Sequence, residues 1–213
     1  NAKISSNKLY MKKFFFKNKI PSSKYYINKS LNKLDNFKNL KYPIIIKPLD
    51  GRGSRGVTYH CNYSNVPWAL KHAKNQSNLK HVLIEEYEYG DQLSVEGFVY
   101  KKKYYPIAFA DRDYSNLKLT QPYIVEKGGI TPSTITKKVE KKINRLCSKI
   151  VKCLKMDFGS IKFDVVINKK KIKFIEFTLR MSGGFWSSDI IPNVYNVNLT
   201  KICILNSIEK KIP

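Results

Sequence analysis

The segment KFDVVINKKKIKFIEFTLR, residues 162–180, determines how the rest of this chain is interpreted. Its β-branched and aromatic residues form two short runs, 161–167 and 172–177, separated by a polar turn, and this pattern predicts a β-hairpin. Asp164 and Glu176 stand four or five residues from the turn, so we expect them to lie side by side across the strand ladder. Acidic side chains in such apolar strands need a positive partner, which is either a metal ion between them or lysines in structural ion pairs.

A glycine-rich loop, DGRGSRG at residues 50–56, follows the proline-bounded apolar run YPIIIKP at 42–48. The run predicts a buried strand that carries Lys47 near its end. Glycines leave backbone N–H groups open to close approach and cationic side chains neutralise charge, so the loop can wrap a polyphosphate. Its side-chain donors are Arg52, Ser54 and Arg55. The Gly-Lys-Ser/Thr ending of a Walker A loop is absent, and a plain glycine-rich hairpin turn is the competing interpretation.

If this loop binds phosphate, the two carboxylates of the hairpin predict a magnesium ion, because Mg²⁺ prefers hard oxygen ligands. Arg180 follows Glu176 by four residues. We expect its guanidinium group to meet a terminal phosphate or a reacting oxyanion.

A third feature is IEEY at residues 84–87, at the end of the apolar strand expected at 81–87, followed by GDQLSVE at 90–96. The backbone of a strand edge that leads into a connection can pair with adenine, and a nearby side chain can hold the ribose hydroxyls. An exposed acidic turn would produce the same pattern, so this feature alone is unspecific.

The composition of the 213-residue chain is that of a soluble globular protein, with 42% hydrophobic and 26% charged residues. No apolar run approaches the roughly 18 residues that span a bilayer, and no signal peptide is present, so we predict a cytoplasmic protein without a membrane partner. Four cysteines without CxxC spacing favour a reducing compartment. Because the chain begins at Asn1 and not at Met, we expect it to be part of a longer protein.

The formal net charge of +24 suggests a nucleic-acid partner at first sight. Only five of the 40 basic residues are Arg, however, and base-reading proteins depend on bidentate guanidinium groups. The lysines are scattered over the whole chain, so we interpret them as a solvated surface and do not expect a nucleic-acid partner. The histidines have no metal-like spacing and are expected in surface or packing positions: His60, His72 and His81.

Hydrophobic periodicity predicts the remaining elements. The apolar positions of 137–155 recur at steps of three and four residues, which indicates an amphipathic helix. Other helices are expected at 7–17, 67–74 and 198–209, and other strands at 57–60, 93–100 and 105–110. These elements predict an α+β fold with mostly antiparallel sheets and with helices on one face of each sheet.

Taken together and in this order, the motifs resemble the ATP-grasp superfamily over nearly all 213 residues. The likeness is to the ATP-binding domains of carbamoyl-phosphate synthetase, biotin carboxylase and related carboxylate–amine ligases. Lys8, a helix and then Ile20-Pro21 look like the opening "DK…GIP", and 42–57 is similar to "P-v-v-v-K-P-x-D-x-x-G-S-x-G-V". Residues 176–180 resemble "E-x-N-x-R", and 181–184 resemble the "(L/M)-(S/G)-G-G" that follows this arginine in amino-acid ligase-like members.

The resemblance implies a role for each matching residue. Nucleotide-binding residues would be Lys8, Lys47, Gly51, Arg52, Gly53, Ser54, Arg55, Gly56, Glu85, Glu86, Tyr87, Glu88 and Gln92, with Glu85 at the exocyclic amine of adenine. Asp164 and Glu176 would hold Mg²⁺, with Mn²⁺ as an alternative. Catalytic residues would be Arg180 and Lys47, and substrate residues Arg180, Ser182, Gly183 and Gly184. Glu126, in a segment similar to a substrate-side loop, is a further candidate.

Two positions depart from the family pattern. Thr178 stands where relatives have the Asn of "E-x-N-x-R", and its hydroxyl is a poorer ligand for a second magnesium ion. Gln92 replaces a ribose-binding Glu, which removes a charged acceptor and is expected to weaken nucleotide binding.

The resemblance also implies the architecture and the activity. A leading helix at 1–21 would pack on a large subdomain at 88–213, and 22–87 would form a small lid subdomain, with antiparallel sheets gripping the nucleotide between them. The Rossmann-like domain that precedes this fold in relatives is absent from the sequence. The implied activity is ATP- and Mg²⁺-dependent phosphorylation of a small carboxylate to an acyl phosphate, which an amine then captures. Without the preceding domain the fragment can bind ATP and lack turnover, and the alternative is a catalytically silent nucleotide- or RNA-binding module.

Overall fold

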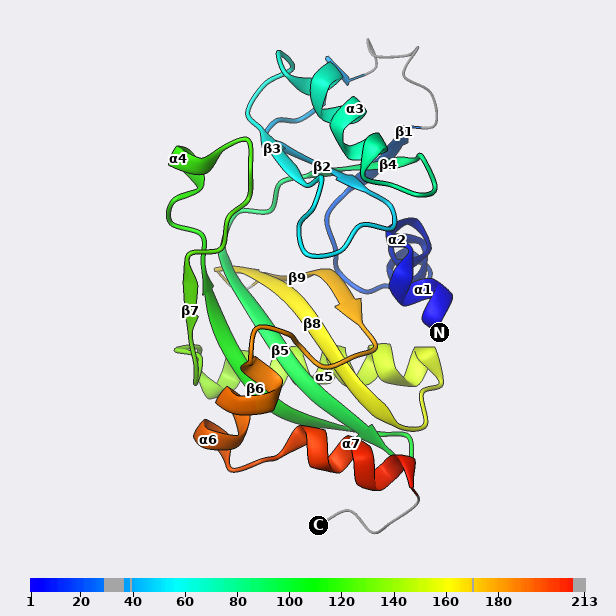
Figure 1. Ribbon diagram of the computed structural model, residues 1–213, viewed down its shortest axis with the longest axis vertical. Coiled ribbons are helices and arrows are strands. Elements are labelled where there is room, and N and C mark those ends of the chain that lie inside the picture. Colours follow the sequence, from blue (N-terminus) through cyan, green and yellow to red (C-terminus); the bar gives the residue numbers. More distant parts are fainter. Residues whose placement is uncertain (29–36, 39, 170, 209–213) are drawn as a thin grey trace.

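In the computed structural model, which describes residues 1–28, 37–38, 40–169 and 171–208, two antiparallel sheets are stacked along the long axis (Figure 1). The small sheet has the order β1-β4-β2-β3, with β1 at Tyr25–Asn28, β4 at Val82–Glu86, β2 at Ile44–Pro48 and β3 at Thr58–His60. The large sheet has the order β7-β6-β5-β8-β9, with β7 at Gly128–Ile130, β6 at Lys103–Asp113, β5 at Asp91–Tyr100, β8 at Gly159–Asn168 and β9 at Lys171–Thr178. The predicted α+β class with antiparallel sheets is confirmed.

The small sheet is covered by α3, Val66–Asn75. Three consecutive isoleucines make β2 a strand, because β-branched side chains suit a pleated, half-buried surface. Pro67 is tolerated in the first turn of α3, where its missing N–H group has no intrahelical acceptor. The buried apolar residues of this small core are Phe37, Ile44, Ile46, Val66, Ala69, Leu70, Ala73, Val82 and Ile84.

Side chains along the strands of the large sheet alternate between an apolar and a polar face. The apolar face packs against α5, Lys137–Leu154, and α2, Lys8–Lys17, in a single core. This core includes Leu93, Val95, Phe163, Val165, Phe174 and Phe177 from the sheet and Met11, Phe15, Ile143, Cys147 and Ile150 from the helices. The side chains of Thr136 and Asn7 accept hydrogen bonds from the first turns of α5 and α2 and so fix where these helices begin. Both helices are confirmed.

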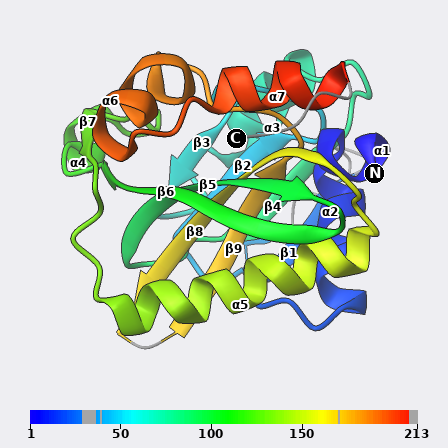
Figure 2. The same ribbon diagram turned by 90° about the horizontal axis from the view of Figure 1, so that it is seen from below.

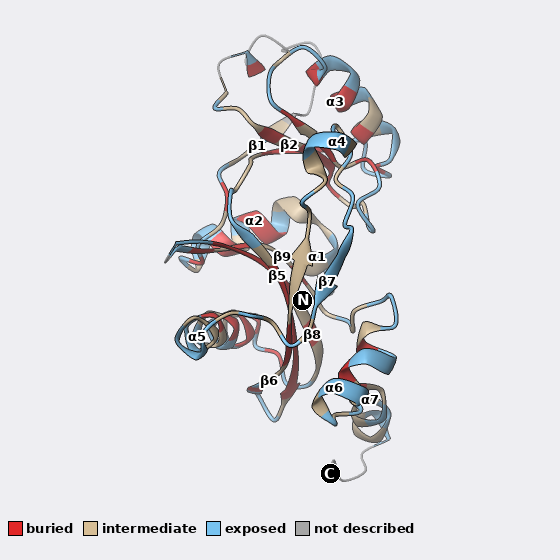
Figure 3. Cartoon of the chain, turned by 90° about the vertical axis from the view of Figure 1, so that its left-hand side faces the viewer, coloured by how far each residue is buried: buried red, intermediate tan, exposed pale blue. Residues whose placement is uncertain are grey.

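The polar face of the large sheet is covered at one end by further helices. A π-helical turn at Trp186–Ile190, then α6 at Ile191–Tyr195 and α7 at Leu199–Ser207, lie on the side opposite α5 (Figure 2, Figure 3). The expectation of helices on one face of each sheet is therefore wrong for the large sheet, because α6 and α7 bury apolar residues such as Leu199 on its second side. No helix in the described part of the chain combines the length and the apolar character needed to cross a membrane.

Several short elements are not predicted by the sequence. They are α1 at Ala2–Ser6, β1, α4 at Leu117–Thr120, β7, the π-helical turn and α6. β1 is a strand because it pairs with β4, with Tyr25 opposite Glu85, and β7 is a strand because it pairs with β6. Such partners come together only in the folded chain. The helix expected at 198–209 forms as α7, and residue 209 lies outside the described residues.

Two links bring the sheets together around the space between them. Ser22 forms an isolated parallel bridge with Phe174 of β9. From the other side, the segment 114–126, which connects β6 to β7, reaches the small sheet, where Tyr123 forms an antiparallel bridge with Thr58 of β3. The walls of the intervening cavity are therefore supplied by both sheets.

Candidate nucleotide-binding site

A cavity of about 220 Å³ lies between the two sheets. It is lined by fourteen of the residues singled out from the sequence: Lys8, Lys47, Gly51, Arg52, Gly53, Ser54, Glu85, Glu86, Tyr87, Glu88, Gln92, Asp164, Glu176 and Arg180. Seven others lie outside its lining: Arg55, Gly56, Glu126, Thr178, Ser182, Gly183 and Gly184. Arg55 lines a neighbouring groove beside α1 and α2. The tertiary structure thus gathers residues from most of the length of the chain at one place.

Lys47 is held at the cavity by a buried cluster of charges. Its Nζ atom lies 2.8 Å from Oε2 of Glu85, and Nζ of Lys12 lies 3.0 Å from Oε1 of the same carboxylate. Nζ of Lys12 also donates to Oγ of Ser23 at 3.1 Å. Burial alone would raise the pKa of Glu85, but the two ammonium groups lower it to about 2. The carboxylate is therefore ionised at neutral pH.

The lysine partners of Glu85 and the burial of Lys12 were not predicted from the sequence, and the contact of Glu85 with adenine stays a prediction. Both oxygens of Glu85 face ammonium groups, so its carboxylate has partners other than the exocyclic amine of adenine, because two buried lysines need a counter-charge. Lys12 was not singled out from the sequence, where it stands among several lysines of one helix. Only its burial, at 2% exposure, distinguishes it from neighbours such as Lys13.

Lys8 connects α2 to the glycine-rich loop. Its Nζ atom donates to the carbonyl oxygen of Gly51 at 2.7 Å, and its backbone N–H donates to the carbonyl of Leu49 at 2.9 Å. Burial lowers the pKa of Lys8, and the charge of Glu176 opposes this shift. The same end of the loop is also anchored by Asp50, which accepts hydrogen bonds from Ser77, Asn78 and Leu79. The loop is thus tied at its base and open at its tip.

Asp164 and Glu176 are direct partners across the β8–β9 ladder, and both line the cavity. Oδ1 of Asp164 lies 2.8 Å from Nζ of Lys162 and 3.2 Å from Nη1 of Arg112. Burial would raise the pKa of Asp164, but these cations lower it. Glu176 forms no hydrogen bond or ion pair with another described residue. On one wall of the cavity the hairpin therefore presents Asp164, whose carboxylate is paired with cations, beside Glu176, whose carboxylate has no such partner among the described residues.

The residues at this wall suit a hard divalent cation. Two facing carboxylates are the usual protein share of a Mg²⁺ site at which phosphate oxygens supply further ligands. Oγ1 of Thr178 is buried and has no hydrogen-bond partner among the described residues, but Thr178 lies outside the cavity lining, opposite Lys162 in the ladder. Within the same part of the chain, no group of three or more His, Cys, Asp or Glu side chains is arranged to hold a metal. The donor set fits a nucleotide-bound Mg²⁺ and not a metal held by protein alone.

Arg112 of β6 is a cavity residue that the sequence analysis missed. Its Nε and Nη2 atoms donate to the two carboxylate oxygens of Glu126, at 3.0 and 2.5 Å, and its guanidinium carbon lies 5.1 Å from the ring centre of Tyr114. The sequence offers little that could have identified Arg112. Its one link to the predicted site is its pairing with Gln92 across the β5–β6 ladder, which becomes evident only from the structure.

The segment after β9 is tied to the polar face of the large sheet. The backbone N–H and the hydroxyl of Ser182 donate to the two carboxylate oxygens of Glu96, at 3.3 and 2.6 Å. Glu96 is fully buried on β5, and burial raises its pKa to about 7. Nη1 of Arg180 donates to the carbonyl of Met181 at 2.8 Å. Residues 181–184 thus have a defined anchor near the cavity without lining it.

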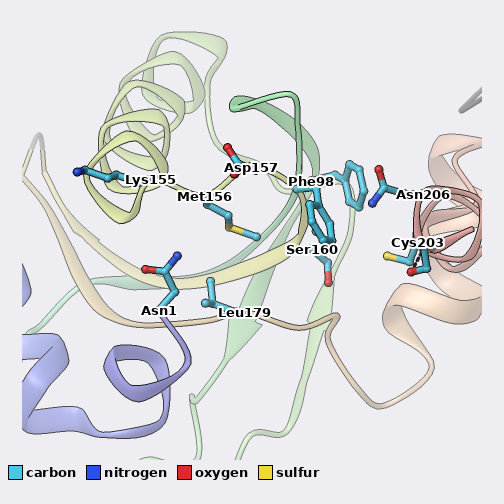
Figure 4. A pocket seen from close by; sticks show the side chains of 12 residues that line it. Asn1, Phe98, Lys155, Met156, Asp157, Ser160, Leu179, Cys203 and Asn206 are labelled. Carbon is cyan, nitrogen blue, oxygen red and sulfur yellow. Dashed lines mark hydrogen bonds between the residues drawn. The ribbon is translucent and has the colours of Figure 1, made fainter. Parts of the chain in front are cut away.

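A separate cavity of about 470 Å³ lies at the other end of the large sheet. Figure 4 shows that its labelled side chains come from the first residue of the chain, β5, the connection between α5 and β8, the start of β8, the segment after β9 and α7, among them Phe98, Met156 and Cys203. It contains none of the residues singled out for nucleotide binding.

Fold and site define a class of protein in which two antiparallel sheets enclose a cavity with lysines and a glycine-rich loop on one side and paired carboxylates on the other. A family model described as "ATP-grasp domain" matches residues 5–184. The chain belongs to the ATP-grasp family.

Individual relatives agree with this assignment. The D-alanine–D-alanine ligase of Azobacteroides pseudotrichonymphae is 30% identical over 159 residues, which cover 72% of this chain and 47% of that protein. The D-alanine–D-alanine ligase of Pelagibacter ubique is 36% identical over 99 residues, which cover 44% of this chain and 31% of that protein. The chain therefore spans half or less of the length of these two relatives.

Solved structures show the same fold at low sequence identity. The L-amino acid ligase from Bacillus licheniformis superposes with a TM-score of 0.81 at 16% identity, covering 97% of this chain and 48% of that one. A biotin carboxylase from Campylobacter jejuni superposes with a TM-score of 0.79 at 16% identity, covering 99% of this chain and 48% of that one. The predicted ATP-grasp fold is confirmed.

Proposed function

We propose that this chain is the ATP-binding part of a carboxylate–amine ligase. In the proposed reaction, ATP phosphorylates a small carboxylate to an acyl phosphate, which an amine then captures. The observation that carries this proposal is the position of Asp164 and Glu176 as direct partners on the wall of a cavity that Lys8 and Lys47 also line. The names of the relatives, D-alanine–D-alanine ligase and L-amino acid ligase, agree with such chemistry.

The nucleotide would lie in the cavity between the sheets. Lys8 and Lys47 offset phosphate charge, and the loop at 50–56 offers backbone N–H groups to the phosphate oxygens. The strand end at 85–88 offers its backbone to adenine, and Gln92 offers a neutral acceptor to the ribose hydroxyls. Burial of Lys47 beside Glu85 fixes its ammonium group at one point, so it needs little reorganisation when a phosphate arrives.

Asp164 and Glu176 would hold Mg²⁺, with Thr178 as a weaker candidate ligand. When bound, the ion neutralises charge on the phosphates. Arg180 lines the cavity and follows Glu176 by four residues, and we assign it to the transferring phosphoryl group. Positioning and electrostatic stabilisation would account for most of the catalysis, as in other phosphoryl transfers.

The chemistry has two steps. A carboxylate oxygen of the substrate bonds to the γ-phosphorus while the bond from that phosphorus to the bridging oxygen breaks, and ADP leaves. The amine lone pair then attacks the acyl carbon, phosphate leaves with the electron pair of the C–O bond, and the amine loses a proton. Water must be excluded from the acyl phosphate, and we assign this task to the loop at 50–56 and to residues 181–184.

Thermal stability in the presence of nucleotide tests the proposal. We expect Mg²⁺-ATP to raise the Tm of the wild type and of the surface control Glu140→Gln, and to raise that of Glu176→Gln much less. Equal shifts in all three proteins would show that the metal site is wrongly assigned. If ATP shifts none of them and RNA shifts all, the chain is a nucleic-acid-binding module instead.

A further inference from the structure

One guanidinium group, that of Arg112, connects Asp164 on the cavity wall to Glu126 in the segment before β7. Nη1 of Arg112 lies 3.2 Å from Oδ1 of Asp164, while its Nε and Nη2 atoms form a two-pronged contact with Glu126. Glu126 precedes β7, which pairs with β6, and Arg112 itself stands opposite Gly129 in that ladder. A displacement of the Arg112 side chain therefore changes the contacts of the segment that carries Glu126.

Asp164 cannot keep its full contact with Arg112 and also bind a divalent cation. Like charges at such short range repel, and a carboxylate has a limited number of lone pairs in good geometry. Lys162 also contacts Asp164, but its ammonium group sits on a flexible stem that can rotate away. The guanidinium of Arg112 is planar, is fixed by Glu126 and lies beside the ring of Tyr114, so its own shift is coupled to these partners.

We propose that Arg112 is a positioning residue that competes with the metal for Asp164 and couples metal loading to the substrate-side segment 126–133. With the metal absent, Arg112 bridges Asp164 and Glu126. When the metal takes Asp164, Arg112 turns fully to Glu126 and tightens that segment against β6. This inference rests on the proposed function, because it takes Asp164 as a metal ligand.

Binding of Mn²⁺ to the 213-residue chain, measured by electron paramagnetic resonance with and without ADP, tests this inference. We expect Arg112→Met to bind Mn²⁺ severalfold more tightly than the wild type, because the competing cation is removed. Glu126→Gln frees Arg112 from its second carboxylate and is expected to weaken Mn²⁺ binding. The control is Arg145→Met, which removes an exposed guanidinium from α5 and leaves Mn²⁺ affinity unchanged.

Hydrogen–deuterium exchange supplies the coupling readout. Mn²⁺ with ADP is expected to slow exchange at residues 126–133 in the wild type and not in Arg112→Met. Arg112→Lys, which keeps a charge but loses the two-pronged contact, is expected to bind Mn²⁺ with intermediate affinity, and it preserves the test if the Met variant folds poorly.

The outcomes separate the two proposals. If the wild type binds Mn²⁺ no better than Asp164→Asn, the metal site of the proposed function is wrong and this inference falls with it. If wild-type binding depends on Asp164 but Arg112→Met binds Mn²⁺ equally or more weakly, this inference alone is overturned.

Discussion

Lys47 and Glu85 form a buried ion pair on adjacent strands of the small sheet, with Nζ 2.8 Å from Oε2 and with side chains that are 6% and 4% exposed. The second oxygen of Glu85 faces Lys12. One carboxylate therefore compensates two ammonium groups and leaves a net positive charge beside the cavity. An anion is the natural complement of such a site, and the phosphates of a nucleotide supply one.

Glu85→Gln tests this arrangement through stability. The substitution leaves two buried ammonium groups unpaired, and we expect it to lower the free energy of unfolding by about 3 kcal/mol or more. Urea denaturation at pH 7 measures the change. The matched control is Glu140→Gln, which breaks an exposed pair with Lys137 on α5 and should cost less than about 1 kcal/mol. Equal effects of the two substitutions would show that the buried pair contributes nothing special.

Lys8→Met tests the tie between α2 and the glycine-rich loop. Because the ammonium group donates to the carbonyl of Gly51, its loss should speed amide exchange at residues 51–56 by roughly tenfold, as expected when one charge-assisted hydrogen bond is removed. Hydrogen–deuterium exchange without nucleotide measures the change. Lys13→Met, at an exposed position of the same helix, serves as the control. Identical exchange in the two variants would contradict this role.

Glu96→Gln tests the raised pKa of a buried carboxylate. Its pKa in the folded protein, about 7, lies above the ordinary value of 4.5, so the folded state holds an extra proton between these pH values. Stability contributed by this group is therefore present below pH 4.5 and falls as the pH rises to about 7. The Gln variant has no carboxyl group at this position, so its stability does not fall with pH for this reason. We expect its stability relative to the wild type to improve from pH 5 to pH 8 by on the order of 3 kcal/mol.

Thermal and urea unfolding at the two pH values measure this difference. Glu140→Gln, whose carboxylate is near the surface, should show the same difference from the wild type at pH 5 and pH 8. If the difference in stability between Glu96→Gln and the wild type is the same at pH 5 and pH 8, the pKa of Glu96 is not raised by burial.

Thiol labelling tests the two extremes of cysteine burial. Cys61 is exposed, whereas Cys147 is fully buried in the large core, where burial raises the pKa of its thiol. Because the thiolate is the reactive form, iodoacetamide should label Cys61 under native conditions and spare Cys147 until the protein unfolds. Peptide mass spectrometry with and without urea measures this. Native labelling of Cys147 at the rate of Cys61 would contradict the packing of α5.

The strands and helices with strong local patterns were predictable from the sequence. The three isoleucines of β2, the three- and four-residue steps of α5 and the turn between β8 and β9 define their elements with little help from the rest of the chain. β1 and β7 were not predictable, because a four-residue and a glycine-containing strand become strands only by pairing. The subdomain boundaries expected at residues 22 and 88 remain predictions.

For the candidate site, the sequence by itself determined which residue types are present and in what order: the lysines, the glycine-rich loop and two carboxylates that stand four and five residues from a turn. Spacing from the turn predicts that Asp164 and Glu176 lie close together across the hairpin. Their direct pairing depends on a β-bulge, because the register shifts by one residue between Val165 and Asp164.

Only the tertiary structure decided the partners of these groups. Lys12 became a counter-ion of Glu85, Arg112 became a bridge between Asp164 and Glu126, and Glu96 became the anchor of Ser182. Most of these pairs join residues far apart in the chain. Charge compensation of a buried group depends on distance in space, and spacing in the sequence does not specify that distance.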